Sequence, residues 1–229
     1  MKRALFGVLV AVLLAGLTSR AFATTTDELQ LTSGLTTVTV TDNGVGDTNS
    51  AAGTINYSNT NFAGWQILVA GGSSNSPGLT PFGVDIFSLT ATCQTPTCAP
   101  LSIGFSDINF TQVVPSLNTF FSATETGAGA TTTQTAYVDT TNTIFGTGTL
   151  IGTVGPFTPP GGSGAASGGG PAGPGDYSLT LVDTLGGGSG LSYSLDGNIT
   201  AVPEPASLTL VGTGLIGLAG LLRRKLLRA

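Results

Sequence analysis

The sequence lacks cationic side chains over most of its length. It has no histidine, and all seven of its lysines and arginines lie in the first 20 or the last seven residues. Between Thr24 and Val202 there are eleven carboxylates and no base, so the formal charge of this region is −11. Nucleic-acid binding needs cations that contact phosphates, and it is therefore excluded. The carboxylates must be solvated, hydrogen-bonded or bound to a cation, because no base can pair with them.

The same absences narrow the catalytic chemistry that this region can support. A Ser-His-Asp triad, a lysine nucleophile and an arginine clamp are all excluded, and zinc hydrolases normally need histidine. The paired carboxylates of glycoside hydrolysis remain as an alternative. The candidates are Asp85, Asp107, Glu125, Asp139, Asp176 and Asp183. Most occur singly in alternating segments or turns, where a solvated carboxylate is the ordinary explanation, so we expect a protein that is not an enzyme.

The N-terminal segment has the three parts of a secretory signal peptide. Lys2 and Arg3 precede an apolar run of 14 residues, and Ala21-Phe22-Ala23 follows after a short polar stretch. The apolar run is shorter than the ~20 residues that span a bilayer. We therefore predict a signal peptide over 1–23, with Ala21 and Ala23 recognised by signal peptidase and the mature chain beginning at the next residue.

The C-terminal segment resembles a membrane anchor. An uncharged run of 17 residues (206–222) is followed directly by Arg223, Arg224 and Lys225. This length is at the short end of what crosses a bilayer, and basic residues beside a span stay on the cytoplasmic side. The pattern predicts a transmembrane helix over 206–222 and a basic tail over 223–229. Residues between the two end segments are then on the outer side of the inner membrane.

The region between the ends has the pattern of a single all-β domain. Short segments with period-two alternation or a continuous apolar run are separated by Gly, Pro, Asn and Ser. They are Leu35–Thr41, Trp65–Ala70, Gly83–Ala91, Leu101–Phe110, Tyr177–Asp183 and Leu191–Thr200. We predict an antiparallel, jelly-roll-like β-sandwich over 24–201. The Pro/Gly/Ser/Ala-rich stretch 156–175 is predicted to be a long flexible loop, because it has little apolar surface to bury.

Two cysteines, Cys93 and Cys98, are the only ones in the chain. Both lie in the exported region, where cysteines in even number normally pair. Their spacing differs from that of a redox Cys-x-x-Cys motif, and a metal site would need more soft ligands. The sequence therefore predicts one local disulfide, at the tip of a hairpin.

The segment TDNGVGDTNS has two readings that both remain open. Asp42 and Asp47 lie beside glycines, and oxygen ligands on a glycine-bent loop suit calcium. Asp, Asn and Asn-Gly are also common in turns that bind no metal, and the EF-hand pattern is absent. Apart from a weakly bound structural calcium ion, no cofactor is expected.

The two end segments together resemble a known sorting signal. Pro203-Glu204-Pro205, the apolar run and the basic tail at the extreme C-terminus are similar to the PEP-CTERM signal of proteins exported by Gram-negative bacteria, many of which make exopolysaccharide. The resemblance implies recognition by an exosortase, which would cleave near 203–205 within the 202–229 signal. It implies an inner-membrane intermediate and then release or attachment at the cell surface.

We therefore expect a non-enzymatic cell-surface or extracellular-matrix protein associated with exopolysaccharide or biofilm. The alternative is a carbohydrate-binding module for the cell's own polysaccharide. That alternative predicts an exposed aromatic ring, with Trp65 or Tyr137 as the candidate glycan contact. A glycosidase that uses two carboxylates is a third, less favoured reading.

Overall fold

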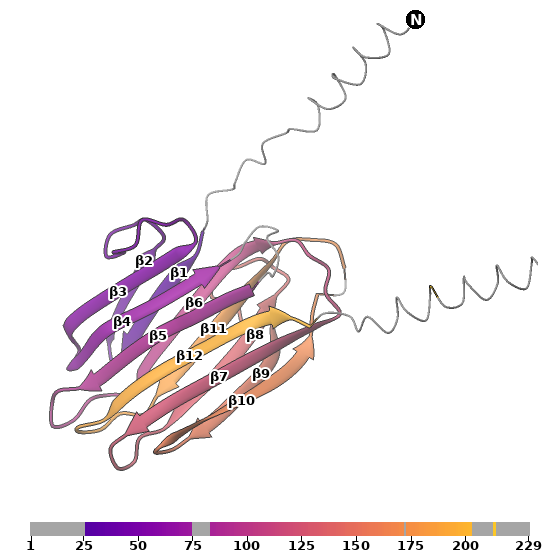
Figure 1. Cartoon of the computed structure of the whole chain (residues 1–229). Coiled ribbons are helices and arrows are strands. Elements are labelled where there is room, and N and C mark those ends of the chain that lie inside the picture. Colours follow the sequence, from indigo (N-terminus) through magenta and orange to yellow (C-terminus); the bar gives the residue numbers. More distant parts are fainter. Residues whose placement is uncertain (1–25, 75–82, 172, 203–212, 214–229) are drawn as a thin grey trace, which may run out of the picture.

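The computed structural model describes residues 26–74, 83–171, 173–202 and 213. The described residues up to Val202 form two stacked antiparallel sheets of six strands each (Figure 1). Sheet A has the order β2 (Thr36–Thr41), β1 (Glu28–Ser33), β6 (Leu101–Phe110), β11 (Tyr177–Leu185), β8 (Thr132–Asp139) and β9 (Thr149–Phe157). Sheet B has the order β10 (Gly161–Gly169), β7 (Ser116–Thr126), β12 (Ser192–Ala201), β5 (Gly83–Cys93), β4 (Trp65–Ser74) and β3 (Thr54–Phe62). The predicted antiparallel β-sandwich is confirmed.

The last eight strands have the connectivity of a jelly roll. Their order is β5–β12–β7–β10 in sheet B and β6–β11–β8–β9 in sheet A, which is the arrangement of two interlocked Greek keys. The first four strands extend this unit, with β1 and β2 added to sheet A and β3 and β4 added to sheet B. Strands that are distant in sequence thus become neighbours, because most connections cross from one sheet to the other.

The core lies between the two sheets and is formed by the inward-facing residue of each alternating pair. Phe105, Phe121, Tyr177 and Tyr193 are among its largest fully buried side chains. The sheets approach closely at Gly72, where a Cβ atom would lie 2.2 Å from the Phe105 ring. Period-two alternation in the sequence therefore becomes a continuous apolar layer between two polar outer faces.

The stretch 156–175 is not a long flexible loop, and this prediction is wrong. Residues Gly161–Gly169 form β10, which pairs with β7 over nine consecutive residue pairs. Backbone hydrogen bonds to β7 require no large side chain, and the small side chains let β9 pack closely beneath the strand. The composition shows that this stretch can bury little apolar surface. It does not show that β7 and β9 lie beside it and hold it in an ordered strand.

The predicted disulfide between Cys93 and Cys98 is confirmed, with a Cα–Cα distance of 6.0 Å. Its predicted place at a hairpin tip is wrong. Cys93 ends β5 in sheet B, and the chain then crosses to β6 in sheet A. The bridge therefore fastens a connection between the sheets, beside the buried Trp65 at the start of β4.

The predicted signal peptide, including Ala21 and Ala23, lies outside the described residues. The same is true of the sorting motif Pro203, Glu204 and Pro205, the helix predicted over 206–222 and the tail that begins at Arg223. Within the part of the chain that the structure describes, none of the helices has both the length and the apolar character needed for a membrane span.

Candidate functional site

The outer face of sheet B carries an ordered array of polar side chains around one exposed aromatic ring. In β7 and β12 the residues of even number point outward and those of odd number point into the core. Antiparallel register places residues of neighbouring strands side by side in rows across this face. One row runs through Ala165, Phe120, Asn198, Asp85 and Ser73. Phe120 is 39% exposed.

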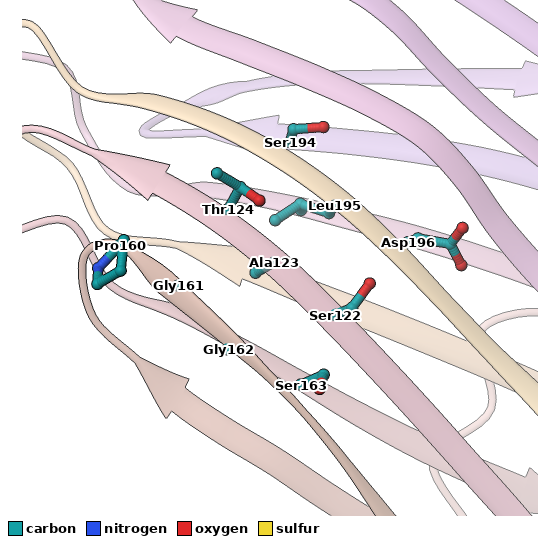
Figure 2. A pocket seen from close by; sticks show the side chains of 10 residues that line it. All are labelled: Ser122, Ala123, Thr124, Pro160, Gly161, Gly162, Ser163, Ser194, Leu195 and Asp196. Carbon is teal, nitrogen blue, oxygen red and sulfur yellow. The ribbon is translucent and has the colours of Figure 1, made fainter.

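A groove of about 530 Å³ lies beside Phe120 on the three strands β10, β7 and β12. The next row of the register, Ser163–Ser122–Asp196, runs through it. Figure 2 shows its hydroxyl groups and one carboxylate; the lining residues are Ser122, Ala123, Thr124, Pro160, Gly161, Gly162, Ser163, Ser194, Leu195 and Asp196. Hydroxyl groups both donate and accept hydrogen bonds, so this groove suits a ligand that itself has many hydroxyl groups.

A buried polar chain supports this face from inside the sandwich. Thr119 donates a hydrogen bond to Oε1 of Gln134 (2.8 Å), whose Nε2 donates to Oδ1 of Asp183 (3.0 Å). The Thr119 hydroxyl also lies 2.9 Å from the Asn198 carbonyl oxygen. Gly197 makes room for the amide, because a Cβ atom there would lie 1.7 Å from Nε2 of Gln134. Thr119, directly before Phe120, is thereby linked through Gln134 to sheet A.

Asp183, at the end of this series of hydrogen bonds, is a buried carboxylate with one oxygen atom unpaired within the described residues. It is completely buried, and its Oδ2 atom has no hydrogen-bond partner among the described residues. Burial raises the pKa of Asp183 from 3.8 to about 7, and the nearby charge of Asp196 acts in the same direction, while the bond from Gln134 opposes it. The protonated acid is therefore favoured through the acidic range.

The outer face also carries two carboxylates, Asp85 on β5 and Asp196 on β12. They are diagonal neighbours, since Asp85 pairs with Asn198, two residues after Asp196. Burial, reinforced by the charge of Asp196, raises the pKa of Asp85 to about 6. Asp196 is not among the carboxylate candidates predicted from the sequence. Its local sequence, an Asp followed by Gly, looks like that of an ordinary turn.

The structure places the other carboxylate candidates away from this face. Asp107 and Glu125 are buried in the core, where they accept hydrogen bonds from Ser74 and Thr132 respectively. Burial raises the pKa of Asp107. The Asp139 carboxylate accepts hydrogen bonds from the backbone and hydroxyl of Thr141 and so holds its own turn. Asp176 is exposed, just before β11.

Trp65 does not contact a glycan in this fold, and that prediction is wrong. Its side chain is completely buried and packs against Tyr193, with ring centroids 5.9 Å apart. Its indole N–H donates a hydrogen bond to the carbonyl of Ala99 (3.0 Å). Tyr137 is half-buried on β8 of sheet A and is therefore not part of the array around Phe120. Sequence reasoning missed Phe120, because a Phe in a strand gives no sign of which face it occupies.

The loop that holds Asp42 and Asp47 is organised by hydrogen bonds to its own backbone. The Asp47 carboxylate accepts from the N–H groups of Asn43 (2.9 Å), Asn49 (2.8 Å) and Asn56 (2.9 Å). The Asp42 carboxylate accepts from the Gly53 N–H at 3.1 Å. Within the described ranges there is no group of three or more His, Cys, Asp or Glu side chains arranged to hold a metal ion. The calcium site stays a prediction.

Comparison with known proteins identifies a motif at the C-terminus. A family model described as a PEP-CTERM protein-sorting motif matches residues 201–225. The match contains Pro203, Glu204, Pro205, Arg223, Arg224 and Lys225, so the predicted resemblance is confirmed. No curated protein matches the chain.

Comparison with solved structures finds distant similarities. The adhesin domain of Epf from Streptococcus pyogenes has 13% identity and a TM-score of 0.40, with 79% of this chain and 62% of that domain covered. TmCBM61, solved with β-1,4-galactotriose, has 7% identity and a TM-score of 0.31, with 76% of this chain and 88% of that one covered. Tailspike protein 4 of bacteriophage CBA120 has 11% identity and a TM-score of 0.31, with 63% of this chain covered. The matched part spans only 21% of the tailspike chain. These scores assign no ligand or activity.

Proposed function

We propose that this chain, which carries a PEP-CTERM sorting motif, is an exported, non-enzymatic protein of the cell surface or extracellular matrix. We further propose that it binds a neutral polysaccharide through the outer face of strands β10, β7 and β12. The motif implies export through the membrane and processing by an exosortase. Association with exopolysaccharide or biofilm follows from the proposed ligand and is part of the proposal.

The observation that carries the proposal is the position of Phe120 beside a hydroxyl-lined groove. An exposed ring offers an apolar surface on which the C–H face of a sugar can stack. Neighbouring hydroxyl and amide groups supply the hydrogen bonds that orient such a ligand. The groove and Phe120 are on adjacent rows of one rigid sheet, so a chain of several sugar units can contact both.

Charge indicates that the polysaccharide is neutral. The region between the two end segments carries eleven carboxylates and no base. Asp196 lies on the proposed binding face, Asp85 lies beside it on β5, and both would repel the carboxylate or sulfate groups of an anionic polymer. The hydroxyl groups of a neutral glycan can instead donate hydrogen bonds to these carboxylates.

The arrangement of these two carboxylates supports a binding role. They project from neighbouring strands on the same outer face of one sheet, and of the two only Asp196 lines the groove. Glycosidases place one carboxyl group on either side of the scissile bond. We therefore expect the chain to bind polysaccharide without releasing reducing sugar, which a reducing-end assay during the binding experiment checks directly.

Replacement of Phe120 by alanine is expected to weaken binding of a neutral polysaccharide at least tenfold, because the stacking surface is lost. The measurement is affinity electrophoresis or calorimetry of the purified chain with soluble β-glucan, xylan and galactan, and with alginate as an anionic polymer. Leu68→Ala is the matched control, since Leu68 is an exposed apolar residue (52%) on β4 of the same sheet. Equal affinity of the two variants, or binding of alginate alone, would contradict the proposal.

Substitution of Pro203, Glu204 and Pro205 together by alanine is expected to leave the chain uncleaved and held in the inner membrane. The parent chain is expected outside the cell, with a C-terminus near residue 205. Cell fractionation and intact mass in a Gram-negative host with an exosortase measure both properties. Ser207→Ala, just beyond the motif, should be processed like the parent. A parent chain that keeps its tail in the inner membrane would refute exosortase processing.

A further inference from the structure

Strand β10 lies at a free edge of sheet B (Figure 1). It pairs with β7 along Gly161–Gly169 with no shift in register, and no strand of the described residues pairs with its other side. An edge strand of this kind directs half of its backbone N–H and C=O groups away from the sheet. A straight row of backbone donors and acceptors is a template for another strand.

Natural edges are normally protected by charge, proline, bulges or short length, and β10 has none of these. It contains nine residues, all Gly, Ser or Ala. The other edges differ. The pairing of β3 with β4 has two register shifts, the pairing of β9 with β8 also has two, and β2 has only six residues.

The inward-facing small residues of β10 are explained by close packing of β9. A Cβ atom at Gly164 would lie 3.0 Å from Val154, and one at Gly168 would lie 2.5 Å from the Ile151 carbonyl oxygen. No such contact explains the small residues at the outward-facing positions. They are Ser163, Ala165, Ser167 and Gly169, all of them exposed, and a Cβ atom at Gly169 would have no neighbour within 4 Å. Small residues on this side leave a second chain free to approach.

We propose that β10 is a self-association surface, at which two copies of this chain pair their β10 strands antiparallel. The distribution of charge permits a second copy to pair at this edge. The region between the end segments has a net charge of −11, so two copies repel each other over most of their surface. The β10 edge is uncharged, and the nearest acid on the outer face of the sheet, Asp196, is on β12, two strands away. Two such edges can meet without placing like charges in contact.

The symmetry of such a pair follows from the pleat. A two-fold axis perpendicular to the sheet pairs β10 antiparallel with its copy and keeps both outer faces on one side. Outward-facing residues must then oppose outward-facing residues, because a slip by one residue would reverse the faces. An axis at Ala165 places Ser163 opposite Ser167 of the second copy. The two six-stranded B sheets then form one continuous sheet.

Self-pairing also has a consequence for ligand binding. The groove on β10, β7 and β12 lies next to this edge, so the two grooves of a pair would open on the same side. Two sites on one face can hold a single polymer with higher avidity than either site alone. The pairing itself depends only on the β10 edge and does not require the polysaccharide.

The test is sedimentation velocity of the full chain in a mild detergent over a range of concentrations. The parent chain is expected to form a dimer whose population rises with concentration. Ala165→Lys combined with Ser167→Lys places four like charges at the β10–β10 interface of the dimer. This change is expected to raise the dimer dissociation constant at least tenfold. Ser58→Lys combined with Thr60→Lys, at exposed positions of edge strand β3, is the matched control and keeps the same terminal segments.

The two lysine variants separate the possible outcomes. Loss of the dimer in the β10 variant and its retention in the β3 variant support the proposal. A parent chain that remains monomeric throughout, or a dimer to which both variants respond equally, overturns it. Thermal unfolding of both variants shows whether either substitution has disrupted the fold, and Ala165→Glu combined with Ser167→Glu then repeats the test with charges of the opposite sign.

Discussion

Replacement of Trp65 by alanine is expected to lower the free energy of unfolding by about 3–5 kcal/mol, the usual cost of deleting a large buried aromatic side chain. The indole is completely buried against Tyr193. Its loss also removes a hydrogen-bond donor to the carbonyl of Ala99, which the Ser33 hydroxyl also contacts, next to the disulfide-linked connection. A loss of this size is a large fraction of the stability of an ordinary domain.

Urea unfolding followed by far-ultraviolet circular dichroism measures this loss, because the variant has no tryptophan to report by fluorescence. Trp65→Phe keeps an aromatic ring and should recover part of the stability. Phe120→Ala is the surface control and should cost about 1 kcal/mol or less, because its side chain is partly exposed. A Trp65→Ala variant with parental stability but no glycan binding would restore Trp65 as a ligand contact.

Asp183→Asn is expected to stabilise the fold above pH 7. The folded state raises the pKa of Asp183 from 3.8 to about 7, so folded molecules bind this proton more tightly than unfolded ones. The parent therefore loses stability as pH rises from about 4 to about 7, and above that range the full penalty of a buried carboxylate remains. Asparagine keeps an oxygen to accept from Gln134 and carries no charge, so the expected gain at pH 8 is on the order of a few kcal/mol.

The measurement is urea unfolding of parent and variant between pH 5 and 8.5, followed by fluorescence of Trp65. The gain should increase between pH 5 and 7 and become constant near pH 8. Asp85 and Asp107 also have raised pKa values and contribute to the pH dependence of both proteins, so the difference between the two curves isolates Asp183. Asp196→Asn removes the neighbouring charge and should shift the same transition to lower pH. A difference that does not vary with pH would show that Asp183 titrates normally.

The sequence by itself determined the organisation of this chain. The restriction of all bases to the two ends defined an acidic region between them, and the C-terminal pattern indicated the sorting motif that a family model matches at 201–225. The period-two alternation of apolar residues predicted the bounds of several strands closely, and for Leu101–Phe110 the predicted and observed bounds are the same. These features are local or compositional, so neighbouring residues are enough to reveal them. The pairing of the two cysteines followed from their number and from the expected export of this region.

Only the tertiary structure decided which side chains meet. The row through Phe120, Asn198 and Asp85 joins strands that are far apart in sequence, and it exists because the sheets are built from crossing connections. The same long-range pairing buried Trp65 and ordered β10, whose small side chains gave no periodic signal. A strand's alternation shows that it has two faces, but which face is covered depends on the sheet that packs against it.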